Sequence, residues 1–187
     1  MPPKAKITKE DIVNAALEIV RAQGAEAINA RAVAAHLNCS TQPVFSNFAS
    51  MAELRLAAVV KAAAVYEDFF RREREIARYP VYKASGMAYI RFAKEEKELF
   101  KLLFMRDRGG ENLPEEQALF SNMEAIVHKN TGLSNETASL FHLEMWAFVH
   151  GIAAMLATGY LDLDEELISK MLTDAYQGLK KQYNAKE

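Results

Sequence analysis

The sequence predicts an all-α protein in which an N-terminal unit of three short helices precedes a larger helical domain. Apolar residues recur every three to four positions from Ile12 onward, which is the period of an amphipathic helix. Capping residues and glycines mark the beginnings and ends of successive helical segments. No segment alternates apolar and polar residues between turn signals, so no strand is predicted.

The first helix begins after Thr8, because Thr8 and Asp11 together have the pattern of a capping box. Gly24 supplies the signal for its end. Between these positions the apolar residues share one helix face, which indicates that this face is buried: Ile12, Ala15, Ala16, Ile19 and Val20.

Two short helices follow, over residues 30–37 and 41–47. Asn29 is a favourable N-cap for the first of them, and Ser40 is the predicted N-cap of the second. Pro43 falls in the first turn of the second helix, where its missing N–H removes no intrahelical hydrogen bond.

Only about three residues, Asn-Cys-Ser, join these two helices. Such a short connection forces a steep crossing and leaves one face of the later helix exposed, which is the geometry of a helix-turn-helix. We expect Phe45 and Phe48 to face inward and the polar residues to face outward. Hydroxyl and amide groups at the exposed positions suit phosphates and base edges, and Gln42 or Asn47 could contact adenine at two points.

Ser50 and Glu53 then begin a long helix over residues 51–78, which Pro80 ends. The predicted domains are residues 1–50, with the helix-turn-helix, and residues 51–187. Further helices are predicted over 82–94, 95–107, 114–130, 135–159 and 164–182.

The stretch "IVNAALEIVRAQGAEAINARAVAAHLNCSTQPVFSNFASMAELRLAAV" resembles the N-terminal DNA-binding domain of TetR/AcrR transcriptional regulators. Further along, "WAFVHG" has the W-x-x-x-H-G spacing of one TetR C-terminal subfamily. The resemblance implies a ligand-responsive regulator, most simply a repressor that releases a palindromic operator when a small apolar or aromatic effector binds. The predicted DNA contacts are Asn29, Arg31, Ser40, Thr41, Gln42, Pro43, Phe45, Ser46, Asn47 and Met51.

Three of these positions depart from the usual family pattern. Phe45, Asn47 and Met51 stand where the family commonly has Tyr, His and Lys. Loss of a phenol and an ammonium group should weaken phosphate binding. It should also lower the slope of log affinity against log salt concentration by about one. The alternative is therefore a helical small-molecule-binding or interaction protein with a weakened DNA-binding half.

The predicted helix 135–159 is apolar on more than one side, so it needs cover on all sides. By resemblance the C-terminal domain dimerises, and a second copy of the chain is the simplest cover. The predicted interface of the homodimer comprises Phe148, Ile152, Met155, Leu156, Ile168, Met171, Leu172 and Ala175.

The resemblance also implies a small-molecule site in the C-terminal domain. Aromatic and Met side chains of the middle helices suit an adaptable apolar pocket, and the alternative, which is favoured at each single position, is that most of them simply fill the core. Trp146 and His150 lie one turn apart, and each carries a polar atom that needs a partner when buried. The predicted pocket comprises Tyr89, Phe92, Phe100, Phe104, Phe120, Met123, Trp146 and His150.

Several other classes are disfavoured. The net charge of −2 does not by itself indicate a nucleic-acid partner. A single cysteine excludes an intramolecular disulfide and suits a cytoplasmic location, and Cys39 is expected to have a structural role. The apolar stretch 145–161 is slightly short for a membrane span and is interrupted by His150, so no membrane partner is predicted.

An enzyme of the di-iron type is a third alternative. The spacing of His128 and His142 from their neighbouring glutamates does not fit the metal-binding pattern of a helical bundle, and we expect both histidines to lie on the solvated surface. No nucleotide-binding loop or nucleophile motif is present. The sequence therefore predicts no catalytic residues, no metal and no cofactor.

Overall fold

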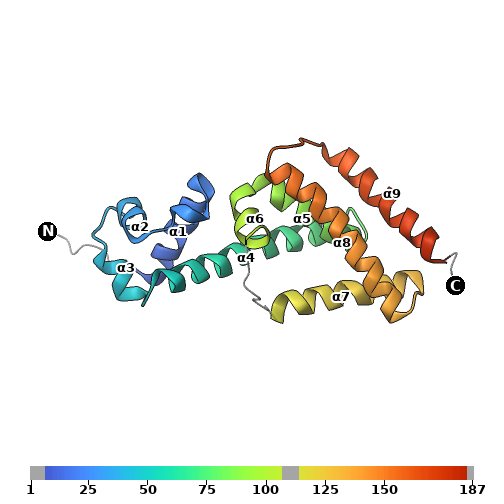
Figure 1. The fold of residues 1–187 in the computed structure, drawn as a ribbon, viewed down its shortest axis with the longest axis horizontal. Coiled ribbons are helices and arrows are strands. Elements are labelled where there is room, and N and C mark those ends of the chain that lie inside the picture. Colours follow the sequence, from blue (N-terminus) through green and yellow to red (C-terminus); the bar gives the residue numbers. More distant parts are fainter. Residues whose placement is uncertain (1–6, 107–113, 185–187) are drawn as a thin grey trace. The chain divides into compact units, whose positions relative to one another are not determined.

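A computed structural model of the chain describes residues 7–106 and 114–184, and in these ranges the secondary structure is helical, with no strand (Figure 1). The predicted all-α fold is confirmed, and the predicted helix ends differ from the observed ones by a few residues. The α-helices are α1 (Lys9–Gln23), α2 (Ala30–His36), α3 (Gln42–Asn47), α4 (Met51–Ile76), α5 (Val81–Glu95), α6 (Lys97–Phe104), α7 (Pro114–Thr131), α8 (Asn135–Ala157) and α9 (Glu165–Asn184).

The helices form two compact units. Unit 1 comprises residues 1–67 and 96–106, and unit 2 comprises residues 68–95 and 107–187. The long helix α4 begins in unit 1 and ends in unit 2. The division of function at residue 50 stays a prediction, because compactness alone does not assign function.

The first two helices of unit 1 are capped as the sequence predicts. Thr8 Oγ1 accepts a hydrogen bond from Asp11 N at 3.1 Å, and Thr8 N donates to Asp11 Oδ2 at 2.8 Å. Gly24 ends α1 with a φ of 84°, a conformation that glycine adopts without steric cost. The side chain of Asn29 caps α2 by accepting from Ala32 N at 2.9 Å.

The turn between α2 and α3 differs in one detail from the prediction. Asn38, two residues after the end of α2, has a φ of 50°, which Asn tolerates better than most other non-glycine residues. Thr41, and not Ser40, occupies the N-cap position of α3, and no side chain caps this helix. Pro43 lies within the first turn, as predicted.

The core of unit 1 is built from the apolar faces of α1 to α4. Phe48 is buried here with an exposed fraction of 2%, whereas Phe45 is 59% exposed. The expectation that Phe45 faces inward is therefore wrong. Val44 on α3 and Phe48 at its C-cap already fill the inner side, and the Phe45 side chain points to solvent. Further core residues are Ile12, Ala16, Ile19, Val20, Ile28, Val33, Leu54 and Ala58.

Helix α6 packs against α1 within unit 1, although it lies far from α1 in the sequence. The Arg21 guanidinium donates two hydrogen bonds to the Glu96 carboxylate, from Nε at 2.9 Å and from Nη2 at 2.8 Å. Such a two-point contact between a guanidinium and a carboxylate is geometrically specific. It therefore anchors the beginning of α6 on α1.

In unit 2, α8 contacts α5, α7 and α9 (Figure 1). Gly86 of α5 allows a close approach, because a Cβ there would lie 3.2 Å from Leu172 Cδ1 of α9. The buried side of α8 contributes Phe141, Met145 and Ile152 to the core. The packing of α5 on α8 therefore forms the centre of this unit.

Helix α8 is long and apolar enough to span a membrane, and 44% of its most apolar window is buried within the structure. Core helices of soluble proteins pass the same test of length and composition. Its remaining surface forms a continuous stripe along the helix, because exposed and half-exposed residues recur every three to four positions. This stripe, hereafter the α8 stripe, comprises Leu140, Leu143, Glu144, Ala147, Phe148, Gly151, Ala154, Met155 and Thr158.

Candidate nucleic-acid interface and candidate ligand site

The surface of α3 and the residues that precede it hold most of the predicted DNA contacts. Gln42, Phe45 and Ser46 are exposed on α3, and Ser40 is exposed just before it. Thr41, Pro43, Asn47 and Met51 are half-buried. The structure therefore brings the predicted residues 40–51 together around one short helix, with different degrees of access.

Hydrogen bonds within α3 reduce the number of side chains that are available for base contacts. Ser46 Oγ donates to the Gln42 carbonyl at 2.9 Å, and Asn47 Nδ2 donates to the Pro43 carbonyl at 2.8 Å. Within the described part of the chain, the Gln42 side chain makes no hydrogen bond. Gln42 is thus the amide of α3 that is ready to contact an adenine at two points.

Two predicted contacts precede α3. Asn29 already accepts from Ala32 N, and its Nδ2 donates to the Ala27 carbonyl at 3.1 Å, so its role is largely structural. Arg31 is exposed near the beginning of α2. Its guanidinium remains a candidate for a phosphate contact.

Arg55 is a basic residue that the sequence analysis missed. It is exposed on α4, and its Nη2 donates to the Ile28 carbonyl at 3.2 Å, which places it beside the beginning of α2. Arg55 lies one helical turn after Met51, the position at which the family pattern commonly has Lys. Residues one turn apart share a helix face, so the spacing of Arg55 from Met51 could have identified Arg55 as a replacement for that Lys.

In unit 2, three predicted ligand residues meet where α5 contacts α8. Tyr89 of α5 is buried, and a hydrogen bond of 2.8 Å joins its hydroxyl to His150 Nδ1 on α8. The rings of Trp146 and His150 are stacked, with their centroids 5.2 Å apart and their planes 17° apart. Burial lowers the pKa of His150 below its ordinary value. A neutral imidazole flanked by two aromatic rings could stack against a flat apolar ligand.

The other predicted pocket residues whose side chains the structure describes do not join this group. Phe92 is fully buried and packs edge-on against Phe69, with centroids 5.4 Å apart, so it fills the core. Phe100 and Phe104 belong to unit 1, where their rings pack against each other with centroids 5.2 Å apart. Met123 is buried in α7, and the Phe120 side chain lies outside the described residues. Phe92, Phe100 and Met123 are therefore core residues rather than the lining of a shared pocket.

A second pair of Tyr and His side chains joins α5 to α8. Tyr82 and His142 share a hydrogen bond of 2.9 Å between the hydroxyl and Nδ1, and His142 is 7% exposed. The expectation that His142 lies on the solvated surface is wrong, whereas His128 is exposed as expected. Burial lowers the pKa of His142, while the negative charge of Glu124 partly opposes this shift.

The lowered pKa of His142 predicts a loss of stability in mild acid. The unfolded chain binds a proton near the ordinary pKa of about 6.5, whereas the folded protein resists protonation. The contribution of His142 is therefore fully present above pH about 6.5 and is lost as the pH falls below it. Thermal unfolding between pH 8 and pH 5 should show this decline, and His142→Gln should make it shallower, while His150, whose pKa is also lowered by burial, accounts for the rest. An unchanged pH profile in the variant would exclude His142 as the source.

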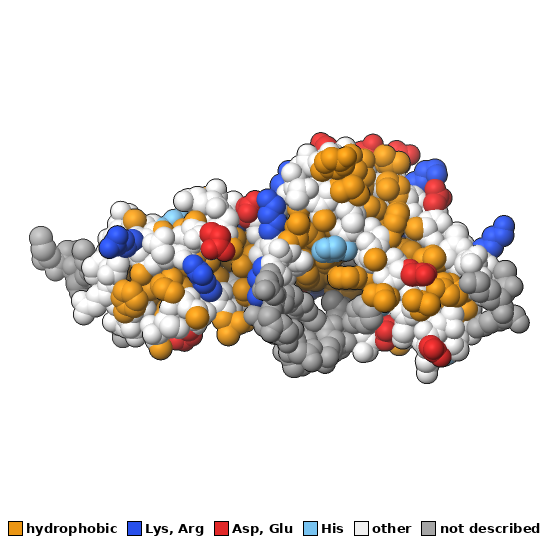
Figure 2. Space-filling model, viewed as in Figure 1, with side chains coloured by type: hydrophobic (Ala, Val, Ile, Leu, Met, Phe, Trp, Pro, Cys, Tyr) orange, Lys and Arg blue, Asp and Glu red, His pale blue; other side chains and the backbone are white. Residues whose placement is uncertain are grey.

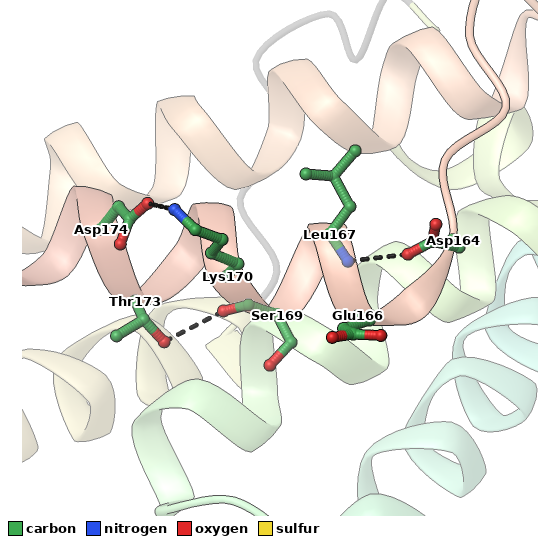
Figure 3. Close-up of a pocket in the computed structure, with 7 residues that line it drawn as sticks. All are labelled: Asp164, Glu166, Leu167, Ser169, Lys170, Thr173 and Asp174. Carbon is green, nitrogen blue, oxygen red and sulfur yellow. Dashed lines mark hydrogen bonds and ion pairs between the residues drawn. The ribbon is translucent and has the colours of Figure 1, made fainter.

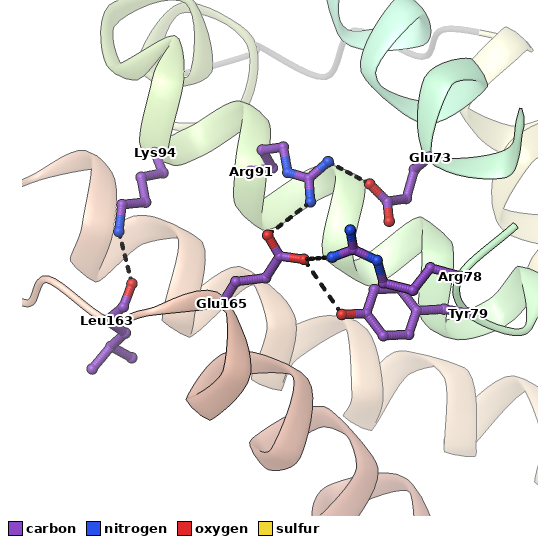
Figure 4. Close-up of polar contacts among 7 residues, drawn as sticks. All are labelled: Glu73, Arg78, Tyr79, Arg91, Lys94, Leu163 and Glu165. Carbon is purple, nitrogen blue, oxygen red and sulfur yellow. Dashed lines mark hydrogen bonds and ion pairs between the residues drawn. The ribbon is translucent and has the colours of Figure 1, made fainter. Parts of the chain in front are cut away.

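A chain of charged side chains joins the end of α4 to α5 and α9 within unit 2 (Figure 4). Arg91 Nη1 donates to Glu73 Oε2 at 2.6 Å, and the Glu73 side chain is only 2% exposed. Arg91 also lies 3.1 Å from Glu165, which Arg78 contacts at 2.6 Å. Lys94 donates to the Leu163 carbonyl at 2.8 Å. This network, hereafter the Arg91 network, connects three helices.

A surface pocket of about 650 Å³ lies along the first turns of α9 (Figure 3). Several of its polar groups already contact one another, since Asp164 Oδ1 accepts from Leu167 N at 2.8 Å and Lys170 pairs with Asp174. None of the predicted ligand residues line it. The lining comprises Asp164, Glu166, Leu167, Ser169, Lys170, Thr173 and Asp174.

The predicted interface residues fall into two groups. Ile152, Leu156, Ile168 and Leu172 are buried in the core of unit 2, so they do not present the surface that the prediction required. Phe148, Met155, Met171 and Ala175 remain exposed or half-exposed. Figure 2 shows hydrophobic side chains gathered on the face of unit 2 that carries α8. Exposed apolar residues that the prediction omitted are Leu140, Leu143 and Leu167.

A sequence model of the tetracyclin repressor-like C-terminal domain matches residues 82–175, about half of the chain. The chain belongs to the tetracyclin repressor-like (TetR) family. This TetR-family protein is 25% identical over 165 residues to an uncharacterised HTH-type transcriptional regulator of Mycobacterium tuberculosis, which covers 84% of this chain and 74% of the relative.

A solved structure of a TetR-family member from Streptomyces coelicolor A3 has a similar fold. Its TM-score is 0.61 at 16% identity, and the match covers 89% of this chain and 96% of that chain. The helix-turn-helix followed by a helical domain therefore agrees with the family fold. TetR-family members regulate transcription by binding DNA in response to ligands, and this TetR-family protein is such a regulator.

Proposed function

We propose that the protein is a cytoplasmic homodimeric repressor, not an enzyme, which releases a near-palindromic operator when a small apolar or aromatic effector binds. The exposed polar surface of α3, next to a buried helix-turn-helix core, is the observation that carries this proposal. Two such helices related by a two-fold axis would contact half-sites about 34–36 Å apart, or a multiple of that distance.

In the proposed complex, α3 contacts base edges while Arg31 and Arg55 contact phosphates. Both arginines are exposed in unit 1. The other cations of α1 and of the first half of α4 are paired with carboxylates: Lys9 with Glu53, Arg21 with Glu96, and Lys61 with Glu10. Arg55 would supply the positive charge that the family commonly has as Lys at the position of Met51.

The proposed dimer forms through the α8 stripe and the exposed side of α9. Leu140, Leu143 and Phe148 place large apolar groups on this surface, and the stripe contains a single charged residue, Glu144. Gly151 leaves room for a helix of a second copy to approach closely, because outside its own helical turn no atom lies within 4 Å of the position that a Cβ would take. Burial against a second copy would remove this apolar area from water.

The proposed effector site is centred on Tyr89, Trp146 and His150. Trp146 is 41% exposed although it stacks on His150, so the group has both an apolar wall and an accessible edge. The spacing of Trp146, His150 and Gly151 supports assignment to the W-x-x-x-H-G subfamily. The link between effector and DNA would be α4, whose last turns are tied to α5 and α9 by the Arg91 network. Effector binding that moves α5 would tilt α4 and change the spacing of the two α3 helices.

The specific DNA contacts can be tested with a duplex selected from a random pool by the purified protein. Replacing both Thr41 and Gln42 with alanine should lower specific affinity by about 10-fold to 1000-fold, because α3 loses its free amide and a hydroxyl. Gln23→Ala is the matched control, since Gln23 is an exposed amide of the same unit outside the helix-turn-helix. Unchanged affinity of the double variant in a gel shift would contradict the assignment of α3.

The salt dependence of the same binding reaction tests the phosphate contacts. Arg31→Ala and Arg55→Ala should each lower the slope of log affinity against log salt by about one. A protein that selects no duplex at low salt would favour the alternative function, a helical small-molecule-binding protein with a weakened DNA-binding half. Phe45, Asn47 and Met51 are the residues that favour this alternative.

A further inference from the structure

The surface of α3 is unusual in having no charge and one large exposed aromatic ring. The sixteen residues from Leu37 to Ala52 contain no Lys, Arg, His, Asp or Glu. Phe45 is 59% exposed in the middle of this segment, whereas Phe48 is 2% exposed. Val44 and Phe48 complete the packing of α3 on the core, so the fold does not require an aromatic ring at Phe45.

Phe45 lies beside the free amide of Gln42. Residues three apart on a helix are neighbours on one face, so the Gln42 side chain and the Phe45 ring are presented together. Ser46 and Asn47 donate their hydrogen bonds to backbone carbonyls of α3 itself. An amide and an apolar ring therefore form the centre of the surface that α3 offers.

A phenyl ring has no group that can donate to or accept from a phosphate, so Phe45 cannot replace the tyrosine hydroxyl that is usual at this position. In the major groove, the apolar group that distinguishes one base pair from another is the 5-methyl group of thymine. Contact with that methyl group would remove an exposed ring from water and discriminate thymine from cytosine at the same time.

We propose that Phe45 is a specificity-determining residue that contacts the 5-methyl group of a thymine in each half-site, next to an adenine that Gln42 contacts. This inference rests on the proposed binding of DNA through α3. It adds that each half-site contains two neighbouring A·T pairs, one of which is recognised through a methyl group without any hydrogen bond.

The experiment uses the full-length protein and the duplex of highest affinity selected from a random pool. Each thymine of both half-sites is replaced in turn by deoxyuridine, which removes the methyl group and leaves the base-pairing groups unchanged. At one thymine per half-site we expect about a fourfold loss of affinity, and about a 15-fold loss when both half-sites are substituted, since one buried methyl group is removed each time.

A second duplex separates the methyl group from the rest of the base. Replacing the sensitive T·A pair by C·G should weaken binding, and replacing it by 5-methylcytosine·G should restore much of the affinity. The Phe45→Ala variant, whose side chain is exposed and outside the core, should bind thymine and uracil duplexes equally. The Phe45→Leu variant keeps an apolar contact and should retain part of the preference for thymine.

The outcomes distinguish this inference from the proposed function. A selected duplex whose uracil substitutions all leave affinity unchanged overturns the thymine contact and leaves DNA binding through α3 intact. A methyl effect of equal size in wild type and Phe45→Ala overturns the assignment to Phe45, because another residue must then make the contact. Failure to select any duplex overturns both proposals.

Discussion

Replacing Arg91 with alanine is expected to lower the free energy of unfolding by about 3–5 kcal/mol, because the buried Glu73 carboxyl group in unit 2 would lose its ion-pair partner. The Glu73 side chain is 2% exposed, and Arg91 Nη1 lies 2.6 Å from its Oε2. Removing one member of a buried ion pair leaves an uncompensated charge, which costs far more than the net contribution of the pair itself. Urea denaturation monitored by circular dichroism measures this change.

Two variants make the interpretation specific. Lys170→Ala breaks the Lys170–Asp174 pair, whose side chains are 70% and 62% exposed, and should change stability by no more than about 1 kcal/mol. Glu73→Leu combined with Arg91→Met removes both charges and should recover most of the stability lost in Arg91→Ala. If Arg91→Ala is as stable as Lys170→Ala, then the network does not hold the end of α4 in the way that the geometry indicates.

Replacing Phe148 with glutamate is expected to weaken the proposed dimer by about 100-fold or more in dissociation constant, corresponding to about 3 kcal/mol. Phe148 is 38% exposed on the α8 stripe, so it belongs to the surface that a second copy would cover. A carboxylate there would be buried without a partner in the dimer but solvated in the monomer. Sedimentation over a range of protein concentrations gives the dissociation constant.

Operator binding should weaken together with the dimer. Two linked α3 helices gain affinity because the second contact is intramolecular, and a monomer loses that gain, which is of order 100-fold to 10,000-fold. Val60→Glu is the matched control for the sedimentation experiment, since Val60 is an apolar residue exposed on α4 in unit 1. A Phe148→Glu protein that remains as dimeric as Val60→Glu would place the interface elsewhere on the chain.

The prediction of the helix-turn-helix shows where local sequence suffices. The capping box of Thr8 and Asp11, the cap at Asn29 and the stop at Gly24 all depend on neighbours in the chain, and the structure confirms each of them. The orientation of Phe45 was predicted wrongly because two nearby aromatic residues offer the same hydrophobicity. Which ring enters the core depends on the register of a helix of only six residues.

The ligand residues show the opposite case. Sequence grouped aromatic residues of the middle helices into one pocket, whereas the structure places Phe100 and Phe104 in unit 1 and Phe92 in the core of unit 2. Composition indicates that these residues are buried but does not indicate beside which helix they are buried. Trp146 and His150 were paired correctly because residues one turn apart on a helix share a face.

The sequence by itself determined the all-α class, the order of the helices and most of their caps, because these features depend on periodicity and on contacts between residues three or four apart. Only the tertiary structure decided which face of α8 is exposed, since a helix that is apolar on several sides carries no signal for its orientation. It also decided that Glu73 and His142 are buried with Arg91 and Tyr82 as partners. A polar residue in a sequence is predicted to be exposed to solvent unless a partner is known. Only the packing of helices that are distant in the sequence supplies the partner that allows such a residue to be buried.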